Sequence, residues 1–313
     1  MIRSAASRLL SMTGSRTYSI GMYAGPSPSA LAAPAECVNP VIVGRDVTDA
    51  IATTVADPFM VRVDGVWHMF FEALAWRTSG RKGEIGHATS RDGLRWKYES
   101  VVLAEAFHLS YPYVFEWRSD HYMIPESSRA GEVRLYRAAR FPDRWVHVKT
   151  LLTGPVFMDS SVFHRDGRWW MLSDTSPAHT HDTLRLFHAP DLLGPWSEHP
   201  RSPVVQGDPR GARPAGRVVT IGDRLLRFAQ VCQPSYGMSV RTFEIVELSA
   251  RGYAEVEVNG LTLAGSGRGW NRSGMHHIDL HQLENGSWMA CVDGWSAVSG
   301  PRQLLRRTAT NRS

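Results

Sequence analysis

Apolar and polar positions alternate along most of this chain, and the alternation recurs in units with a common plan. Each unit starts with an apolar run, continues through a polar turn and ends in an aromatic run. A period of two, interrupted by Asp-Gly, Asn-Gly or similar pairs, predicts two antiparallel strands joined by a tight hairpin. The units are ADPFMVRVDGVWHMFFE, SYPYVFEWRSDHYMIPE, MDSSVFHRDGRWWMLSD and, more loosely, MHHIDLHQLENGSWMACVD.

Three of these units align residue by residue. Each has a polar or aromatic residue twelve positions before a methionine: Asp57, Tyr111 and Asp159. Each has an acid three positions after that methionine: Glu72, Glu126 and Asp174. Another unit, ARPAGRVVTIGDRLLRFAQ, keeps the strand–turn–strand pattern but has Gln230 near its end, and the last unit ends with Asp293. Repetition at roughly 50-residue spacing predicts a blade architecture.

The segments after each hairpin also repeat, as an alternating strand, a turn and an aromatic that starts a further strand. These aromatics are Trp96, Trp145, Trp196 and Tyr253. We therefore predict an all-β fold, a five-bladed β-propeller with four-stranded antiparallel blades. The fifth unit is short, and the early segment RTYSIGMY is expected to supply its outer strand and close the ring. Residues 17–313 are expected to form this single domain, after a disordered stretch at 1–16.

Composition narrows the function classes. The 313 residues are 43% hydrophobic and include 11 tryptophans, which suit packing between blades. The net charge of +5 is dispersed, and we see no concentrated basic face of the kind that binds nucleic acid. The denser basic stretches, RTSGRKGE and the tail RQLLRRTATNR, are either solvated segments or attract an anionic ligand such as a phosphate or nucleotide sugar.

Compartment signals are weak. Three cysteines, Cys37, Cys232 and Cys291, form neither a disulfide framework nor a metal-binding pair, which suits a reducing compartment. No apolar run reaches transmembrane length. The first residues, MIRSAASRLLSMTGSR, have a weak transit-peptide composition, but a cytoplasmic protein with a disordered start is the expectation. The sequence predicts no oligomeric state.

Propeller geometry predicts where the repeated residues meet. The innermost strand of each blade starts at one mouth of the central channel, and the second strand returns to that mouth. The strand starts are Asp57, Tyr111, Asp159, Arg213 and the pair His276 and His277. The second-strand ends are Glu72, Glu126, Asp174, Gln230 and Asp293. Clustered carboxyl groups raise one another's pKa values, and such clusters often mark functional sites.

The chemistry that fits this funnel is glycosyl transfer, because breaking a glycosidic bond needs one carboxylate as base or nucleophile and a second, protonated carboxyl as acid. We predict Asp57, Glu126 and Asp159 as catalytic residues. Substrate contacts are expected from Tyr111, Arg213, His276, His277, Glu72 and Asp174. The structural alternatives are a turn or strand cap for Asp57 and Asp159, a contact between blades for Glu126, Glu72 and Asp174, pairing with the acid ring for Arg213, and aromatic packing for Tyr111.

The run HHIDLH is a candidate metal site, since His277, Asp279 and His281 fall on one side of a strand. Strand residues two apart are separated by roughly 7 Å, so one run seldom supplies all ligands. We predict no metal and no cofactor, and no phosphate loop, nucleophile elbow or HExxH motif occurs.

Several longer motifs are shared with a known family. VADPFM, MFFE, GEIGHATSRDGLRW, HLSYPYVFE, YMIPES, RPAGR and YGMSV resemble the N-terminal domain of plant glucosamine inositolphosphorylceramide transferases and their bacterial relatives, from about Ser19 to Gly294. The resemblance implies a five-bladed propeller akin to glycoside hydrolase families 43 and 32. It also implies that a separate glycosyltransferase domain, which follows the propeller in the plant proteins, is not contained in this chain.

The likeness to family 43 implies roles for individual residues. An aspartate at the start of the first blade is the base there, which matches Asp57 in ADPF. A third-blade aspartate that tunes pKa matches Asp159 in FMDSSVF. The general acid is a fourth-blade glutamate, where this chain has Arg213. Three alternatives follow: Glu126 donates the proton from another direction, the reaction is transfer and not hydrolysis, or activity is lost.

The first choice is thus a carbohydrate-active enzyme that cleaves or transfers a glycosyl unit and binds a carbohydrate, nucleotide-sugar or phosphosugar ligand. The alternatives are a non-catalytic sugar- or partner-binding propeller and a structural module that acts through its rim loops.

Overall fold

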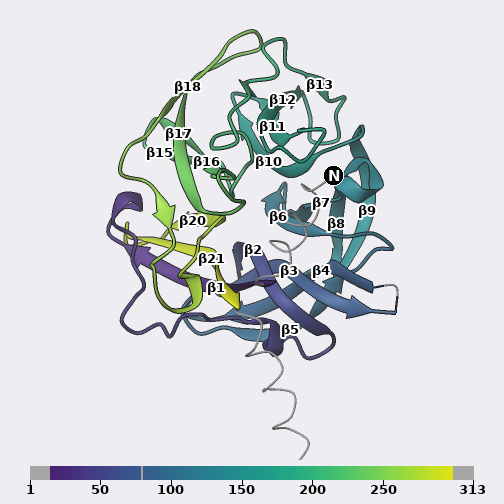
Figure 1. Ribbon diagram of the computed structural model, residues 1–313. Helices are drawn as coiled ribbons and strands as arrows, with labels where there is room; N and C mark the ends of the chain where they lie inside the picture. Colours follow the sequence, from purple (N-terminus) through teal and green to yellow (C-terminus); the bar gives the residue numbers. More distant parts are fainter. Residues whose placement is uncertain (1–14, 79, 299–313) are drawn as a thin grey trace, which may run out of the picture.

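Residues 15–78 and 80–298 are described by the computed structural model, and they form five antiparallel sheets around a central axis (Figure 1). Blade 1 contains β2 (Ile51–Val63), β3 (Val66–Arg77), β4 (Gly80–Ser90) and β5 (Lys97–Leu103). Blade 2 contains β6 (Ser110–Trp117), β7 (Asp120–Glu126), β8 (Glu132–Arg140) and β9 (Arg144–Thr153). The predicted five-bladed propeller is confirmed.

The remaining blades depart from the four-strand plan at their outer edges. Blade 3 contains β10 (Met158–Arg165), β11 (Arg168–Asp174), β12 (Thr183–Ala189) and two short outer strands, β13 (Ser197–Glu198) and β14 (Val205–Gln206). Blade 4 contains β15 (Val219–Ile221), β16 (Arg224–Gln230), β17 (Ser239–Leu248), β18 (Tyr253–Glu257) and β19 (Leu263–Ala264). In blade 3, Pro200 and Pro203 separate the two outer strands, because proline has no N–H to give to the ladder.

Blade 5 is closed by the N-terminal segment, as predicted. It contains β20 (Ile278–Gln282), β21 (Trp288–Val298) and β1 (Ser15–Gly25). Strand β1 pairs antiparallel with β21 over its whole length, from Ser15 opposite Val298 to Gly25 opposite Trp288. β1 begins within the stretch that was expected to be disordered, and the rest of that expectation, residues 1–14, lies outside the described residues, as does the tail after 298.

The tight hairpins of the sequence pattern are present. Asp64 and Gly65 join β2 to β3 with φ of 49° and 79°, and Asp166 and Gly167 join β10 to β11 with 51° and 71°. Two successive residues with positive φ match the turn whose twist suits a hairpin.

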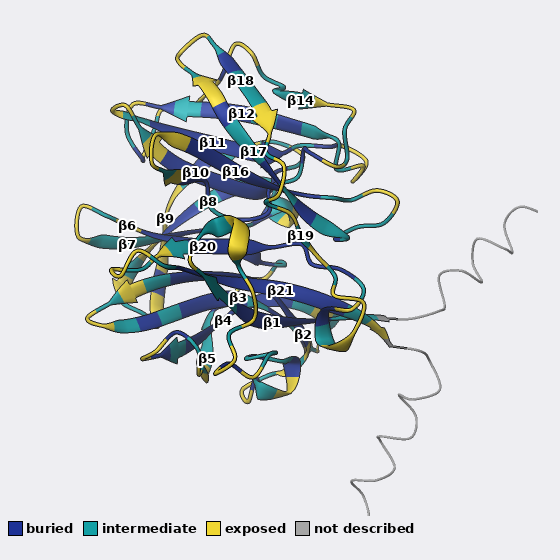
Figure 2. Ribbon diagram, turned by 90° about the vertical axis from the view of Figure 1, so that its left-hand side faces the viewer, coloured by how far each residue is buried: buried dark blue, intermediate teal, exposed yellow. Residues whose placement is uncertain are grey.

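Aromatic side chains fill the wedges between blades. Trp117 on β6 meets Trp169 on β11 edge to face, with ring centroids 4.9 Å apart. Phe70 on β3 meets Trp145 on β9 at 5.5 Å. Buried residues run along the middle of each sheet while the loops are exposed (Figure 2). The helical segments among the described residues are single 3₁₀ turns: η1 (Pro28–Ala30), η2 (Gly44–Asp46), η3 (Ser128–Ala130) and η4 (Gly269–Asn271). No helix in this described part is long and apolar enough to cross a membrane.

Candidate active site

A β-bulge places the first residue of the site in each of blades 1, 2 and 3. Asp57, Tyr111 and Asp159 have φ of 52°, 47° and 50°, although none is glycine. At each of them the register with the second strand shifts, so that two residues face one. A bulge re-aims side chains, and a left-handed residue of this kind costs about 1–3 kcal/mol. The shared offset of twelve residues before methionine therefore marks a repeated, strained backbone feature.

The repeated acids lie beside these bulges. The residues that precede the bulges pair with the acids that end the second strands: Ala56 with Glu72, Ser110 with Glu126, and Met158 with Asp174. Strand starts and second-strand ends therefore meet at the same mouth of the propeller, as the repeat predicted.

Asp159, Arg213 and Glu126 form one cluster from blades 2, 3 and 4. Arg213 Nε donates to Asp159 Oδ2 at 2.6 Å, and Arg213 Nη2 donates to Glu126 Oε2 at 3.4 Å. Burial raises the pKa of Glu126 well above its usual range, and the nearby charge of Asp159 adds to this. Burial alone would raise the pKa of Asp159 too, but the charge and hydrogen bond of Arg213 hold it below its usual value. The surroundings thus favour a proton on Glu126 and a negative charge on Asp159.

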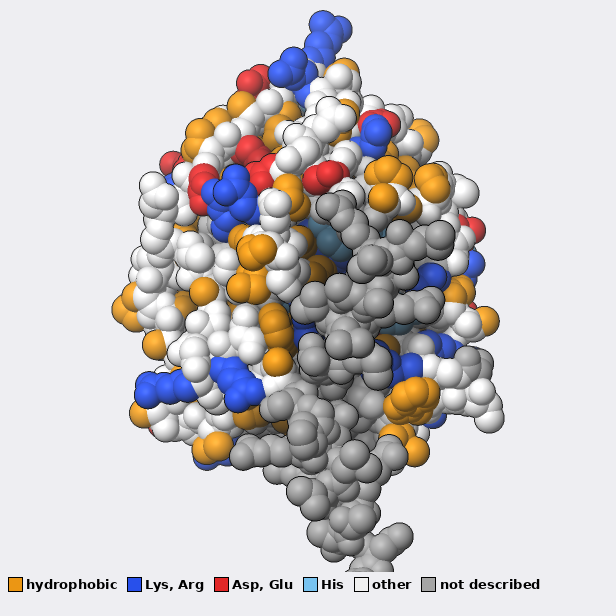
Figure 3. Space-filling model, viewed as in Figure 1, with side chains coloured by type: hydrophobic (Ala, Val, Ile, Leu, Met, Phe, Trp, Pro, Cys, Tyr) orange, Lys and Arg blue, Asp and Glu red, His pale blue; other side chains and the backbone are white. Residues whose placement is uncertain are grey.

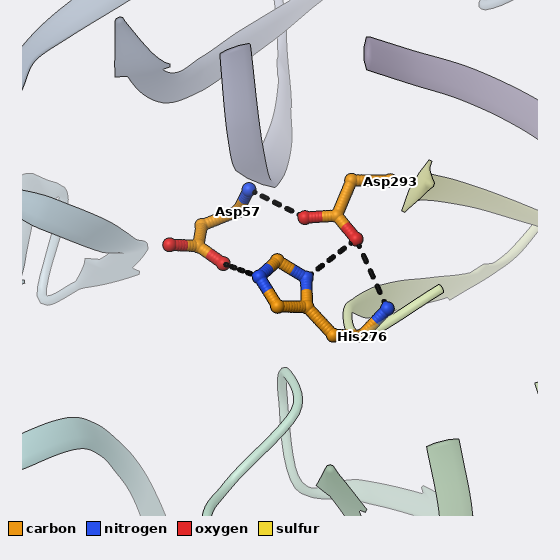
Figure 4. A group of neighbouring side chains, drawn as sticks. All are labelled: Asp57, His276 and Asp293. Atoms are coloured by element: carbon orange, nitrogen blue, oxygen red, sulfur yellow. Dashed lines mark hydrogen bonds and ion pairs between the residues drawn. The ribbon is translucent and has the colours of Figure 1, made fainter. Parts of the chain in front are cut away.

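Asp57, His276 and Asp293 form a second cluster, where blade 5 meets blade 1 (Figure 4). Asp293 Oδ2 accepts from the backbone N–H of Asp57 at 3.0 Å, and Asp293 Oδ1 accepts from His276 Nδ1 at 2.7 Å. His276 Nε2 lies 3.9 Å from Asp57 Oδ1. Burial raises the pKa of Asp57 to about 7, although the charge of His276 opposes this. Burial alone would lower the pKa of His276, but the carboxylates of Asp293 and Asp57 outweigh burial and raise it to about 8.

Several buried polar atoms at the site have no hydrogen-bond partner among the described residues: Asp57 Oδ1, Asp159 Oδ1, Gln230 Oε1 and both ring nitrogens of His277. His277 is fully buried, with Nδ1 3.9 Å from Asp57 Oδ1, and burial lowers its pKa to about 4. Nearly all buried polar groups in proteins are satisfied, so a group of exceptions calls for an explanation, and a polar ligand provides one.

Glu72 and Asp174, predicted as substrate contacts, each hold a loop histidine. Glu72 Oε1 lies 3.3 Å from His108 Nε2, and Asp174 Oδ2 lies 3.0 Å from His181 Nδ1. His108 Nδ1 accepts from the backbone N–H of Gly83 at 2.9 Å, which leaves the proton on Nε2 facing Glu72. The two acids therefore contact histidines that line the pocket, but they do not line it themselves.

Tyr111 is a predicted site residue that does not line the pocket; its ring packs edge-on against His277, with ring centroids 5.3 Å apart. Its ring is fully buried, and its hydroxyl contacts Ser161 Oγ at 2.8 Å and the backbone N–H of Gly216 at 2.7 Å. Gly216 has φ of 134°, and a Cβ there would lie 1.7 Å from the carbonyl oxygen of Ile278. The hydroxyl of Tyr111 thus links blade 2 to Gly216, where the backbone leaves no room for a Cβ atom.

The two arginines of the RPAGR segment, Arg213 and Arg217, contact different groups. Arg213 reaches the site, whereas Arg217 Nε donates to Asp279 Oδ1 at 2.8 Å on the axis. Asp279 Oδ2 also accepts from His281 Nε2 at 2.8 Å and from the backbone N–H of Met60 at 2.7 Å. The charge of Arg217 thus neutralises that of Asp279, the acid of the HHIDLH run.

One group of possible metal ligands occurs among the described residues, and it is the Asp57, His276 and Asp293 cluster, whose ligand atoms lie within 4.8 Å of one another. Both oxygens of Asp293 already accept hydrogen bonds, and His276 Nδ1 is engaged with one of them. Asp293 and His276 thus satisfy each other by a hydrogen bond, whereas Asp57 Oδ1 has none.

A pocket of about 670 Å³ opens above the Glu126 and Arg213 cluster. It is lined by His108, Glu126, Ser128, Arg129, Pro155, Val156, Met158, His179, His181, Arg213 and Tyr236. On the face shown in Figure 3, histidine side chains are visible in a central hollow, beside lysine or arginine side chains. Asp57 and Asp159 are buried and do not line this pocket.

Sequence reasoning missed most of the pocket wall. Arg129, His181 and Tyr236 lie in the loops that follow second strands, and His108 lies in the loop before β6. Such loops do not repeat, so alignment of the units does not find them. The signal that could have found them is topological: a loop after a second strand begins at the mouth where that strand ends.

Comparison with known proteins agrees with this geometry. Residues 12–295 match the family model described as glucosamine inositolphosphorylceramide transferase 1, N-terminal. The chain is 37% identical over 309 residues to glucosamine inositolphosphorylceramide transferase 1 of Oryza sativa subsp. japonica, covering 92% of this chain and 41% of that protein. For the protein of the same name in Arabidopsis thaliana the identity is 34%, covering 91% and 40%. The chain thus spans about two fifths of the length of these relatives.

Solved structures share the fold at low sequence identity. The catalytic domain of the Coprinopsis cinerea GH62 alpha-L-arabinofuranosidase has a TM-score of 0.57 at 13% identity, covering 80% of this chain and 93% of that one. Zg3597, a family 117 glycoside hydrolase of Zobellia galactanivorans, has a TM-score of 0.54 at 14% identity, covering 94% and 98%. The fold, the repeated site and the match along most of its length place this chain in the family of glucosamine inositolphosphorylceramide transferase 1 N-terminal domains.

Proposed function

We propose that this propeller is a carbohydrate-active domain that cleaves or transfers a glycosyl unit at the floor of the pocket. The observation that carries the proposal is the cluster of Glu126, which lines the pocket and has a raised pKa, with Asp159, whose pKa is lowered, and with Asp57, whose buried Oδ1 has no hydrogen-bond partner in the described part of the chain. Glycosidic bond cleavage needs one carboxyl group in each protonation state. The names of the family relatives and of the propellers with the same fold support a glycosyl substrate.

In this proposal each carboxyl group has a separate role. Glu126 donates a proton to the leaving oxygen, and Asp57 acts as base or nucleophile once it is ionised, above about pH 7. Asp159 and Arg213 orient Glu126 and set its charge. The charge of Asp57 also contributes to the raised pKa of Glu126, so the two groups share one electrostatic environment.

A binding-only function is the second candidate, and the burial of Asp57 favours it. Asp57 is 5% exposed and does not line the pocket, so a substrate must displace neighbouring groups to reach it. In that case groups that line the pocket, such as Glu126, Arg213 and Tyr236, would hold the sugar and no bond would break.

The two candidates separate in one experiment. Wild type, Asp57→Asn and Glu126→Gln are assayed for binding and turnover with a panel of 4-nitrophenyl pyranosides and furanosides. Asp64→Asn and Glu116→Gln, exposed residues of the same blades, are the matched controls. Catalysis predicts that either site substitution lowers kcat by about 100-fold or more, while the controls keep it. Binding without turnover in the wild type supports the second candidate, and turnover that survives both site substitutions excludes the proposed catalytic roles.

A further inference from the structure

One residue of the pocket wall, Tyr236, packs against the buried cluster of Asp57, His276 and Asp293 (Figure 4). The Tyr236 ring meets the His276 ring edge to face, with ring centroids 5.3 Å apart. His276 Nε2 in turn lies 3.9 Å from Asp57 Oδ1. None of the three cluster residues lines the pocket, and Asp57 is only 5% exposed. A ligand in the pocket therefore meets Tyr236 before it meets the cluster.

The Tyr236 ring fills the space between side chains of three blades. Arg213 of blade 4 has its Cζ 5.1 Å from the centroid of the Tyr236 ring, within the range of a cation–π contact. The ring of His181, from blade 3, lies 5.5 Å away between centroids, and His276 belongs to blade 5. Within residues 15–78 and 80–298, no hydrogen bond engages the Tyr236 hydroxyl. The ring is thus held in place by packing, which a movement of its backbone would undo.

The loop between β16 and β17 carries Tyr236 and is fixed close to both of its ends. The backbone N–H of Cys232 donates to a backbone carbonyl in the segment between β14 and β15, at 2.8 Å. The carbonyl of Gly237 accepts from Trp295 Nε1 at 2.7 Å. Between these two anchors lies the tip of the loop, residues 233–236.

Arg16, on the ring-closing strand β1, holds this tip. Its Nη1 donates to the carbonyl of Tyr236 at 2.8 Å, and its Nη2 donates to Ser235 Oγ. The guanidinium lies over the ring of Trp295, with Cζ 4.5 Å from the ring centroid. In the part of the chain that the structure describes, these are the only hydrogen bonds that the tip forms with another segment. Both acceptors are neutral, so the contact holds the tip without the cost of separating two opposite charges.

We propose that residues 231–238 form a lid loop over Asp57, in which Tyr236 blocks the way to Asp57 and Arg16 holds the loop closed. The inference rests on the proposed function, because it takes Asp57 to act on a glycosyl ligand of the pocket. With the loop closed, Glu126 is open to the pocket and Asp57 is not. When the bonds of Arg16 break, the tip leaves His276 and the pocket extends to Asp57. Because β1 also completes blade 5, access to Asp57 is coupled to closure of the ring.

The thiol of Cys232 can report whether the lid loop is open. It is only partly exposed, and burial raises its pKa to about 11, although the charge of Arg213 and the backbone N–H of Gly237 oppose this. Thiol reagents attack an accessible thiolate, so the reaction at Cys232 depends on how often the loop opens. The other two cysteines, Cys37 and Cys291, are buried elsewhere in the propeller.

The test measures the rate at which the thiol reagent DTNB labels the full chain under native conditions. Arg16→Gln should be labelled about tenfold or more faster than the wild type, because the loss of two hydrogen bonds from a charged donor favours the open loop. Ser235→Ala removes one of these bonds and should accelerate labelling less. Arg272→Gln is the matched control: Arg272 Nη2 also donates to a backbone carbonyl of blade 5, that of Ala297, but outside the lid loop. This control should be labelled at the wild-type rate.

Asp57→Cys in the Cys232→Ser background moves the reporter to the site itself, and Arg16→Gln should accelerate labelling there too. If Asp57→Cys prevents folding, the comparison at Cys232 decides alone. Equal labelling of wild type and Arg16→Gln overturns the lid, as does acceleration at Cys232 without acceleration at position 57.

Acceleration by Arg16→Gln that persists in Cys232→Ser with Asp57 intact also overturns the lid, because it shows that the ring as a whole has loosened. None of these measurements needs turnover. A negative result therefore leaves the catalytic roles of Asp57 and Glu126 standing, and loss of those roles leaves the labelling result unchanged.

Discussion

The carboxylate of Asp293 accepts a hydrogen bond from the backbone N–H of Asp57, 3.0 Å away, although 236 positions separate them in the chain. This contact joins the last blade to the first at the site itself. The other oxygen of Asp293 binds the backbone N–H and the ring Nδ1 of His276. One buried side chain therefore fixes both the strained Asp57 backbone and the orientation of His276.

Asp293→Asn should lower the free energy of unfolding by about 3 kcal/mol. The substitution leaves a buried, cationic His276 without its nearest counter-charge, and breaking one partner of such a pair is strongly destabilising. Urea denaturation at about pH 7 measures this, with Asp64→Asn as the exposed control. A loss below about 1 kcal/mol would show that the pair does little for stability.

Stability should fall as the pH rises from about 6.5 to about 8.5. The pKa values of Glu72 and His276 are raised to about 8 and that of Asp57 to about 7, so folding favours their protonated forms. Stability from such groups is complete below their unfolded pKa values and is lost as the pH rises through the folded values. The lowered pKa of His277 acts in the opposite direction, but its contribution is already complete above about 6.5.

Glu72→Gln tests this pH dependence directly. The substitution removes one titrating group, so the slope of unfolding free energy against pH should become shallower by up to about 1.4 kcal/mol per pH unit. Glu116→Gln, which is exposed, should leave the slope as in the wild type. A wild-type stability that is level or rises over this range contradicts the prediction.

The positive charge of Arg213 should account for most of its contribution to stability. The forked shape of its guanidinium should account for most of its contribution to ligand binding. Arg213→Gln leaves Asp159 buried without its ion-pair partner and should cost about 3–5 kcal/mol. Arg213→Lys keeps the charge but cannot contact Asp159 and Glu126 in the same fork, so most of the stability should remain while ligand affinity falls. Melting temperature and calorimetric binding, measured on both variants, separate the two effects. Equal stability of the two variants would contradict this account.

The buried ion pair of Arg217 and Asp279 should be replaceable by apolar residues with only a small loss of stability. Asp279→Leu alone leaves Arg217 buried and unpaired and should cost about 3–5 kcal/mol, whereas Asp279→Leu with Arg217→Met should recover much of the loss. A double-mutant cycle by urea denaturation gives the coupling energy. Additive effects of the two substitutions would mean that the pair acts as two independent residues.

The fold and the place of the site could be predicted because both depend on the repeat. The offset from Asp57, Tyr111 and Asp159 to a methionine reflects an identical hairpin register in three blades. Ring closure by β1 could be predicted from the missing outer strand of the last unit. The left-handed backbone at the three strand starts could not, because positive φ is uncommon for every residue except glycine; aspartate is enriched there, but tyrosine is not.

The direction of individual side chains depends on contacts that no repeat encodes. Tyr111 occupies the same bulge position as Asp57 and Asp159, but its longer side chain reaches the backbone of Gly216. Arg129 and His179 lie in loops of different lengths, for which no periodicity exists. The disordered start and the cytoplasmic location remain predictions.

The central claim is that closing five sheets into a ring brings Asp57, Glu126 and Asp159 to one sugar-binding site. A crystal structure of the protein soaked with a ligand that calorimetry has identified tests it most directly. The account predicts a sugar ring over Glu126, with its hydroxyl groups donating to the partnerless oxygens of Asp57 or Asp159. A ligand bound elsewhere on the propeller, with these three carboxyl groups unchanged and out of reach, would contradict it.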